Sequence, residues 1–487
     1  MMPLPRCASL LLLVALSVVV PGRAHCTGFS RTDPDSPVGY VLAKDSDAQS
    51  SPFINEVDGD TASIAFANQA PDTPAPITAT ATHKPRCKST RKPTPTPTPT
   101  ASENYSTPVN GSAQSSHIQY AIRSGNVPSQ GVNLGGWLVS EHWMNKEAEI
   151  WKGLTDEQAG TGEQTAFTHS DYDTAVARFT QHRDTFITED EIAAITRAGL
   201  NTVRVPVGYW VVGFDHHDPS DRKQWKNFAP GGLAYLDRLI RDWAKMHNVA
   251  VLISMHAAKG SQNGADHSSP EQPAKSLWSS FPENLASTLD AVKFLAARYK
   301  DEDAFLGIGL MNEPGGTTSN QELYKYYEDA YQAIRKDSGN DCILTIAPLL
   351  WEQSANFMTD LLPGATNVWV EWHRYFLWGY ETASEDELLG SAMDKFRDDV
   401  NAWKRKSDKK MFIGEFSFAT AGKFQDTTKL KQFGQKQLDV LRTVVNGGWT
   451  FWSWRIYGDE NGVNPWSLRS LLRNGIFSLS SPGQQSS

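Results

Sequence analysis

The sequence is short of cysteine, of long apolar runs and of excess positive charge. Its 487 residues include four cysteines, and Asp plus Glu (55) outnumber Lys plus Arg (46), which gives a net charge of −9. This acidic balance argues against nucleic acid as a partner. No apolar run approaches the ~20 residues that a membrane-spanning helix needs. We therefore expect no membrane span in the mature chain.

The first 24 residues have the pattern of a secretory signal peptide. Arg6 precedes an apolar segment from Leu10 to Val20, and small residues at Gly22 and Ala24 precede a cleavage site at His25. The apolar segment is too short to anchor the chain in a bilayer. We expect residues 1–24 to be removed and the protein to be secreted, to the medium or the cell wall.

Residues 25–116 lack the apolar periodicity of helices and strands. Residues 93–100 alternate proline and threonine, a composition typical of O-glycosylated stalks, and N-glycosylation sequons follow at Asn104 and Asn110. We interpret residues 25–116 as a glycosylated stalk or linker. The alternative is a small binding module in its first two thirds.

The few cysteines give no sign of a metal site. Cys7 lies in the leader, and Cys26 and Cys87 flank a polar region, where a disulfide between them is plausible in an oxidising compartment. Cys342 opens an apolar run and is expected to be a buried thiol. No cysteine and histidine spacing is typical of metal ligands, so the sequence predicts neither a metal nor a cofactor.

From Ile118 onward, strand-like apolar runs alternate with amphipathic helical segments, as in βα units around a parallel sheet. Eight such strands over residues 117–487 predict an α/β fold, a (β/α)₈ TIM barrel with long βα loops. An open, doubly wound sheet is the competitor, but no glycine-rich phosphate loop follows an early strand. The predicted strands are Gly131–Leu134, Thr202–Val207, Ala250–Met255, Leu306–Met311, Ile343–Ala347, Val368–Trp372, Met411–Gly414 and Thr450–Trp454.

Helices are predicted between these strands. A capping box of Thr188 and Glu191 is expected to begin the first of the helices that we single out. The predicted helical segments are Glu189–Ala198, Leu233–Met246, Glu385–Lys404 and Leu430–Val445.

Polar residues cluster where the predicted strands end, which is where TIM barrels carry their catalytic groups. In chain order they are Arg204, His256, Asn312, Glu313, His373, Tyr375, Glu415 and Trp452. Buried ion pairs that close the barrel would explain Arg204 with one glutamate, but not the whole cluster.

Two glutamates at strand ends suit the cleavage of a glycosidic bond. One carboxyl protonates the leaving oxygen, and a second that stands ~5–5.5 Å away attacks the anomeric carbon with net retention. Arg204 would keep Glu415 ionised, and Asn312 could bind the sugar 2-hydroxyl. The 16 tryptophans offer flat apolar rings against which sugar C–H faces stack.

These residues stand in motifs that resemble glycoside hydrolase family 5, and within it the exo-β-1,3-glucanase subgroup. The motifs are Gly131-Val-Asn-Leu-Gly-Gly-Trp-Leu138 with Glu141, Val203-Arg-Val-Pro-Val-Gly-Tyr-Trp210, Gly260-Ser-Gln-Asn-Gly264 with Asp266, Asn312-Glu-Pro314, Ile413-Gly-Glu415 and Gly448-Trp-Thr-Phe-Trp-Ser-Trp454.

The resemblance implies a role for each matching residue. Glu313 is implied as the acid/base and Glu415 as the nucleophile, with His373 and Tyr375 as their supporting pair. Trp452 matches the aromatic floor under the sugar. Glu141 and Asp266 match groups that grip its hydroxyls.

One departure affects the expected specificity. The subgroup has phenylalanine where this chain has Ala265, so half of an aromatic clamp for the departing sugar is missing. Trp378 stands near the position of the other half. Without this ring, another linkage preference and an endo mode stay open as alternatives to exo cleavage of β-1,3 linkages.

We predict a monomeric, secreted, retaining hydrolase that releases glucose from the non-reducing ends of β-1,3-glucan, a polysaccharide or oligosaccharide partner. One alternative is an endo-β-glucanase, or a glucosidase for β-1,6 linkages or conjugates. Transfer to another sugar could follow from the same covalent intermediate. A third is a non-catalytic barrel that binds wall carbohydrate.

Overall fold

The described residues, 117–220 and 223–479 of this computed structural model, form a closed barrel of eight parallel strands. Each strand pairs with the next, and β1 pairs with β8. The predicted TIM barrel is confirmed. The strands are β1 (Ser129–Asn133), β2 (Thr202–Gly208), β3 (Ala250–Ala257), β4 (Phe305–Gly309), β5 (Ile343–Ile346), β6 (Val368–Phe376), β7 (Lys410–Thr420) and β8 (Gly448–Phe451).

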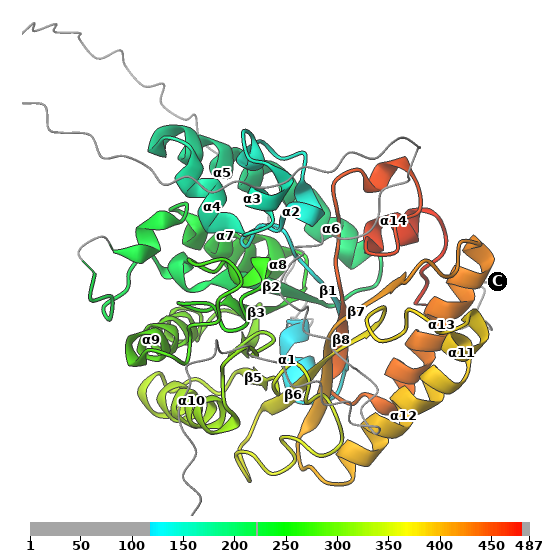
Figure 1. Cartoon of the computed structure of the whole chain (residues 1–487). Helices are drawn as coiled ribbons and strands as arrows, with labels where there is room; N and C mark the ends of the chain where they lie inside the picture. Colours follow the sequence, from blue (N-terminus) through cyan, green and yellow to red (C-terminus); the bar gives the residue numbers. More distant parts are fainter. Residues whose placement is uncertain (1–116, 221–222, 480–487) are drawn as a thin grey trace, which may run out of the picture. The chain divides into compact units, whose positions relative to one another are not determined.

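The helices lie around the strands (Figure 1). The long ones are α5 (Tyr172–Phe186), α9 (Pro282–Arg298), α10 (Asn320–Gln332), α12 (Ser391–Lys404) and α13 (Thr427–Val444). The shorter ones are α1 (Ile118–Arg123), α2 (His142–Asn145), α3 (Asp156–Ala159), α4 (Glu163–His169), α6 (Glu189–Arg197), α7 (Gly232–Arg238), α8 (Ala244–Met246), α11 (Glu385–Leu389) and α14 (Leu468–Arg473).

All eight predicted strands exist, but several end elsewhere. Strands β6 and β7 run on to Phe376 and Thr420, because the residues that follow the predicted ends stay buried and paired. Strand β8 stops at Phe451, so Trp452 follows the strand instead of lying within it. The carboxyl end of the sheet is therefore longest where β6 and β7 meet.

Two predicted helices are interrupted. The segment Leu233–Met246 contains α7, a π-helical stretch (Leu239–Trp243) and α8. The segment Glu385–Lys404 divides at Gly390 into α11 and α12. The spacing of apolar residues stays that of an amphipathic helix across both interruptions, and for this reason the sequence predicts a continuous helix in each segment.

The predicted capping box at the start of α6 is wrong. Thr188 is the N-cap residue, but its side chain makes no capping hydrogen bond. The Glu191 carboxylate instead accepts hydrogen bonds from Nε1 of Trp454 and Nη1 of Arg469, at 2.9 Å for the latter. Glu191 therefore bonds to an indole N–H and an arginine cation that are distant in the sequence, and it does not cap its own helix.

The barrel strands are buried along nearly their whole length, as expected for a parallel sheet covered on its outer face by helices. Closure between β1 and β8 depends on Gly448 (φ 103°), where a Cβ atom would stand 2.0 Å from the carbonyl oxygen of Ser129. Cys342 is fully buried and has a free thiol, which confirms that prediction.

Predictions for the N-terminal part concern residues outside those described. They are the signal peptide (1–24), the stalk (25–116), the Cys26–Cys87 pair and the sequons at Asn104 and Asn110. In the described part of the chain, no helix is both long and apolar enough to cross a bilayer.

Candidate active site

Glu415 lies in β7 and is held by groups from two other strands. Nη1 of Arg204, in β2, donates to Oε1 of Glu415 at 2.9 Å, and the Tyr375 hydroxyl, in β6, donates to Oε2 at 2.8 Å. Nδ1 of His373 lies 3.4 Å from the same Oε2. Both carboxylate oxygens therefore have fixed positions at the carboxyl end of the barrel.

A register shift between β6 and β7 brings His373 beside Glu415. The two residues are direct Cα partners, and the irregularity falls between Trp372 and His373. Bulges of this kind re-aim side chains and are frequent next to active sites. Here the shift directs His373 toward both glutamates.

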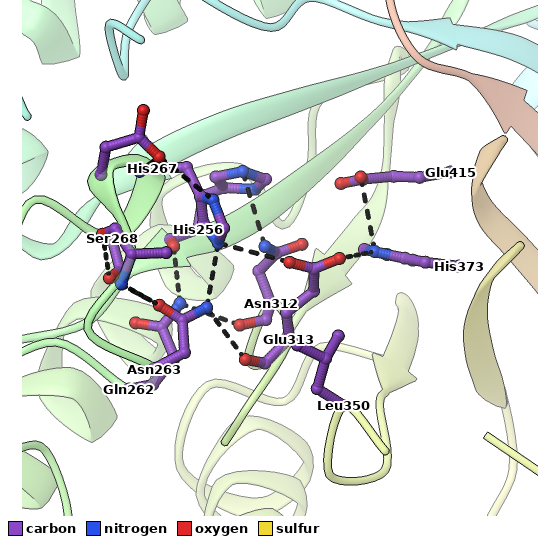
Figure 2. A network of polar contacts seen from close by, with 12 residues as sticks. His256, Gln262, Asn263, His267, Ser268, Asn312, Glu313, Leu350, His373 and Glu415 are labelled. Atoms are coloured by element: carbon purple, nitrogen blue, oxygen red, sulfur yellow. Dashed lines mark hydrogen bonds and ion pairs between the residues drawn. The ribbon is translucent and has the colours of Figure 1, made fainter. Parts of the chain in front are cut away.

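Glu313 lies in the loop after β4, between two histidines (Figure 2). Nδ1 of His373 stands 2.7 Å from its Oε1, and Nε2 of His267 stands 3.3 Å from its Oε2. The Asn263 side-chain amide donates to the backbone carbonyl of Glu313 at 3.1 Å. Glu313 itself has φ 44°, a left-handed conformation that costs free energy for a residue with a Cβ.

The two glutamates approach each other closely. One carboxylate oxygen of Glu313, one of Glu415 and a ring nitrogen of His373 all lie within 4.8 Å of one another. The carboxyls of retaining glycosidases stand ~5–5.5 Å apart, against ~6.5–9.5 Å in inverting ones. A separation of carboxylate oxygens within 4.8 Å is compatible with direct attack by one carboxylate.

Arg204 connects the site across the barrel. Besides Glu415, its guanidinium donates to Oδ1 of Asn133 at 2.9 Å and Oδ1 of Asn312 at 2.7 Å, and it pairs with Oε1 of Glu371 at 2.8 Å. A buried cation with this many charged and polar acceptors is strongly held in one orientation.

Glu371 is a third buried carboxylate, which the sequence analysis did not identify. It is 3% exposed, and Oε1 lies 3.2 Å from Nε2 of His373. Its side chain crosses Gly414, where a Cβ would meet Oε1 at 1.9 Å. The glycine of the Ile413-Gly-Glu415 motif is therefore needed to make room for Glu371.

The charges in this cluster shift two pKa values strongly. Burial raises the pKa of Glu371, but Arg204 and His373 outweigh burial and bring it to about 2. Burial lowers the pKa of His373, but Glu415, Glu313 and Glu371 outweigh burial and raise it to about 10. At neutral pH His373 is therefore a cation between three carboxyl groups.

The two glutamates differ in their protonation. Burial raises the pKa of Glu415, with His373 and Arg204 acting against the rise. Burial also raises the pKa of Glu313, but hydrogen bonds with His267 and His373 bring it well below its usual range. In the resting site Glu313 is therefore the more readily ionised of the two.

Glu141 and Asp266 form a second acidic group beside His267. One ligand atom from each of these three residues lies within 4.8 Å of the others. Oε2 of Glu141 accepts from Nε1 of Trp143 at 2.9 Å, whereas its buried Oε1 has no hydrogen-bond partner among the described residues. Burial and the nearby Asp266 raise the pKa of Glu141 to about 8.

A metal ion at either of these two groups would have to compete with a proton for a histidine nitrogen. Each includes a histidine, and metal binding requires a neutral imidazole. Burial lowers the pKa of His267, but its hydrogen bond to Glu313 and the charges of Glu313, Glu141 and Asp266 raise it to about 9. Both histidines, His267 and His373, thus hold protons that a metal would have to displace.

Aromatic rings surround the carboxylates. The His256 ring stacks on Trp452 with centroids 5.4 Å apart and planes within 5°. Tyr375 contacts Trp378, whose side chain is 45% exposed, with centroids 5.4 Å apart. Trp466 lies against Trp143, Tyr375 and Trp378 at 5.3, 5.5 and 6.3 Å.

All the predicted site residues lie at this end of the barrel or contact a residue that does. Arg204, Asn312, Glu313, His373, Tyr375 and Glu415 share one hydrogen-bond network, and Nδ2 of Asn312 lies 3.5 Å from Nε2 of His256. The sequence analysis missed Trp143, His267, Glu371 and Trp466. His267 directly follows Asp266 in a recognised motif, which was an available signal.

Comparison with known proteins gives a consistent result. Residues 161–458 match the family model described as cellulase, glycosyl hydrolase family 5. The probable glucan 1,3-beta-glucosidase A of Emericella nidulans is 31% identical over 396 residues, covering 72% of this chain and 89% of that protein. The glucan 1,3-beta-glucosidase of Blumeria graminis is 27% identical over 413 residues, covering 74% and 88%.

A solved structure shares the fold. The crystal structure of rutinosidase from Aspergillus niger superposes with a TM-score of 0.60 at 18% identity, over 73% of this chain and 99% of that one.

Proposed function

Since this chain belongs to glycoside hydrolase family 5, we propose that it is a retaining β-glucosidase-type hydrolase of β-1,3-glucan. The observation that carries the proposal is the pair of carboxylate oxygens, from Glu313 and Glu415, within 4.8 Å of each other. This separation suits a double displacement through a covalent intermediate.

In the first step, Glu415 attacks the anomeric carbon while Glu313 gives its proton to the departing oxygen. The glycosidic C–O bond breaks, an ester between sugar and Glu415 forms, and the leaving chain departs as an alcohol. In the second step, ionised Glu313 takes a proton from water, whose oxygen attacks the anomeric carbon. The ester bond to Glu415 breaks as the new C–O bond forms, the sugar leaves with retained configuration, and both glutamates return to their initial states.

Neighbouring side chains prepare Glu415 for this role. Arg204 and Tyr375 each hold one of its oxygens, so the attacking carboxylate is oriented before the sugar arrives. Oδ1 of Asn312 is engaged by Arg204, which orients the side-chain amide. We propose that its N–H groups donate to the sugar 2-hydroxyl, and that Trp452 forms the floor beneath the ring.

The reactive form needs the proton on Glu313 and the negative charge on Glu415. The resting contacts favour the opposite distribution. The two forms contain the same number of protons, so their ratio does not depend on pH. The rate should therefore follow a bell-shaped curve whose two apparent pKa values belong to the pair.

The substrate proposal rests on the relatives and on the second acidic group. Relatives at 31% and 27% identity carry the name glucan 1,3-beta-glucosidase. Glu141 has a buried oxygen without a partner among the described residues, which suits a sugar hydroxyl donor. We propose that Glu141 and Asp266 grip a terminal glucose and close one end of the pocket, so that cleavage proceeds from non-reducing ends.

The proposal is tested by the time-resolved products from a linear β-1,3-glucan, separated by chromatography. Glucose alone from the earliest times is the expected result. A ladder of oligosaccharides would instead indicate an endo-glucanase with an open cleft. An absence of products would refute the β-1,3-glucan assignment and direct the search to other β-linkages.

One observation favours transfer to a sugar acceptor as a second activity. Ala265 is half-buried where the subgroup has phenylalanine, and Trp378 beside the site is exposed. The binding site for the departing sugar thus has an aromatic ring on one side and added space on the other. Products longer than the substrate, formed at high oligosaccharide concentration, would reveal transfer.

We also propose that the enzyme acts outside the cell. The support is the predicted leader at residues 1–24 and the proline- and threonine-rich segment that follows. N-terminal sequencing of protein from the medium of an expressing cell should give His25 as the first residue.

A further inference from the structure

Two consecutive side-chain amides in the loop after β3 bind the backbone around Glu313. The amide nitrogen of Gln262 donates to the carbonyl of Asn312 at 2.8 Å, and the amide nitrogen of Asn263 donates to the carbonyl of Glu313 at 3.1 Å. Figure 2 shows both amides beside the loop that carries Glu313. The acid/base is therefore held through its main chain as well as through its carboxyl group.

Two further hydrogen bonds hold the residues that follow Glu313. The Leu350 N–H, in the loop after β5, donates to the carbonyl of Pro314 at 2.8 Å, and the Gly315 N–H donates to the carbonyl of Gln262 at 3.0 Å. Glu313 itself has φ 44°. A residue with a Cβ keeps this conformation only where the surrounding structure holds it. These bonds therefore determine the direction in which the Glu313 carboxyl leaves the loop.

The Asn263 side chain is itself fixed in orientation. Its Oδ1 accepts from the Ala265 N–H at 3.0 Å and from the Ser268 hydroxyl at 2.7 Å. Because both donors meet Oδ1, the amide nitrogen is left to face the Glu313 carbonyl. Nδ2 also lies 2.9 Å from Nε2 of His267. Asn263 thus joins the turn that follows it to the backbone of the acid/base.

We propose that Asn263 is a positioning residue for the acid/base: its amide holds the carbonyl of Glu313, and so keeps the Glu313 carboxyl where it can protonate the leaving oxygen. The inference rests on the proposed function, because Asn263 acts through Glu313. A displacement of ~1 Å at a catalytic group can lower the rate by about 10²-fold. Loss of the Asn263 amide should therefore impair proton transfer while the Glu313 carboxyl itself remains.

The leaving group of the substrate distinguishes this role from a structural one. The value of kcat/KM reports the steps up to formation of the covalent intermediate. In those steps a poor leaving group needs the proton of Glu313, whereas an activated aryl group needs little protonation. A displaced acid therefore lowers kcat/KM for the poor leaving group alone. A loss of folded enzyme lowers it by the same factor for both substrates.

The experiment compares wild type, Asn263→Ala and a matched control, Asn201→Ala, on phenyl β-glucoside and on 2,4-dinitrophenyl β-glucoside, the activated substrate. Asn201, directly before β2, makes the same kinds of bond at the opposite end of the barrel. Its Nδ2 donates to the carbonyl of Pro128 at 3.0 Å, and its Oδ1 accepts from the Gln130 N–H and the Thr202 hydroxyl, both at 2.8 Å.

We expect Asn263→Ala to lower kcat/KM by about 10–100-fold on the phenyl glucoside and by less than about 3-fold on the dinitrophenyl glucoside. The ratio of the two values should stay at that of wild type in Asn201→Ala. The same substitution of Asn263 in a His267→Ala background separates the two contacts of Nδ2. A further selective loss there supports the bond to the Glu313 carbonyl, and no further loss would overturn it.

Equal losses on the two glucosides in Asn263→Ala, or no loss on either, would overturn the inference and leave the proposed function standing. A wild type that cleaves no β-glucoside and no β-glucan would overturn both. Thermal unfolding checks that each variant is folded. If Asn263→Ala does not fold, Asn263→Asp, which keeps Oδ1 and loses the N–H donors, makes the same comparison.

Discussion

Glu415 and Glu313 are held by different kinds of neighbour, and this separates the expected effects of replacing them. Glu415 is fixed by Arg204 and Tyr375, which donate to it from two strands. Glu313 sits in a strained loop between His267 and His373. At the scale of single residues, we propose the first as a fixed nucleophile and the second as the group whose proton moves.

Glu415→Gln should reduce kcat on every substrate by about 10⁴-fold or more, because the amide cannot form the covalent intermediate. The fold should persist, since glutamine retains the shape and an oxygen for Arg204. The assay is glucose release from laminari-oligosaccharides, beside Glu302→Gln, a half-buried glutamate just before the opposite end of β4. Wild-type rates in Glu415→Gln would refute the nucleophile assignment.

Glu313→Gln should slow cleavage of glucan by about 10²–10⁴-fold, the usual contribution of a general acid. An aryl glucoside with a good leaving group needs little protonation, so formation of its intermediate should be affected much less. Burst and steady-state rates on both substrates measure the difference. Equal losses on the two would argue against an acid role.

At this scale the sequence predicted the residues that belong to motifs and missed those that do not. Glu313 and Glu415 end apolar runs and stand out. Glu371 lies inside a run of large apolar residues, Val368–Trp372, and nothing local separates it from a strand residue that faces solvent. Its identity as a buried partner of Arg204 depends on a contact across the barrel.

At the scale of elements, Arg204 joins β1, β2, β6 and β7 through Asn133, Glu371 and Glu415. If the cation shared by two buried carboxylates is replaced, their charges are left uncompensated. This lowers the free energy of unfolding more than the loss of one hydrogen bond does. The end of the barrel that carries Glu371 and Glu415 is therefore held together by charge interactions as well as by apolar packing.

Arg204→Met should lower the free energy of unfolding by about 3–5 kcal/mol, since Glu371 and Glu415 lose their shared cation. Urea unfolding followed by tryptophan fluorescence measures the change. The control is Arg397→Met on α12, which breaks an exposed pair with Asp394 and should cost at most about 1 kcal/mol. Similar losses in the two variants would contradict this account of the network.

The order of strands was predictable because apolar runs and helices alternate in the sequence, but their ends were not. β6 and β7 extend beyond the predicted ends because Tyr375 and Glu415 are buried by each other and by Arg204. The cap at Thr188 failed for a related reason, since Glu191 found partners in Trp454 and Arg469. In both places, contacts with charged or indole side chains that are distant in the sequence override the preferences of the local sequence.

At the scale of the whole molecule, several buried carboxyl and histidine side chains have higher pKa values in the folded state than in the unfolded state. Burial raises the pKa of Glu163 from its ordinary 4.5 to about 7, despite Arg183. A group of this kind stabilises the fold fully below pH 4.5, and its contribution is lost as pH rises through 7. Glu141, His267 and His373 act in the same direction up to about pH 8, 9 and 10.

The melting temperature should therefore fall as the pH rises from about 6.5 to 9, since below that range the buried His182 and His256, whose pKa values burial lowers, act in the opposite direction. Glu163→Gln should remove part of this pH dependence. Because the pKa of Glu163 rises from 4.5 to about 7 on folding, its share of the free energy of unfolding should change by on the order of 2–3 kcal/mol between pH 5 and 8. Thermal unfolding across this range measures it, with Glu157→Gln on the exposed face of α3 as control. An identical slope in Glu163→Gln and wild type would contradict the prediction.

The pairing of β1 with β8 limits how early in synthesis the barrel can fold. β1 lies near the start of the described chain and β8 near its end, yet they are hydrogen-bonded neighbours. A chain leaving the ribosome has made β2, and with it Arg204, long before β7 brings Glu415 or β8 closes the ring. Ring closure pays the full entropy of a long loop. Barrel and nucleophile site are therefore completed together, only after synthesis has reached the last strand.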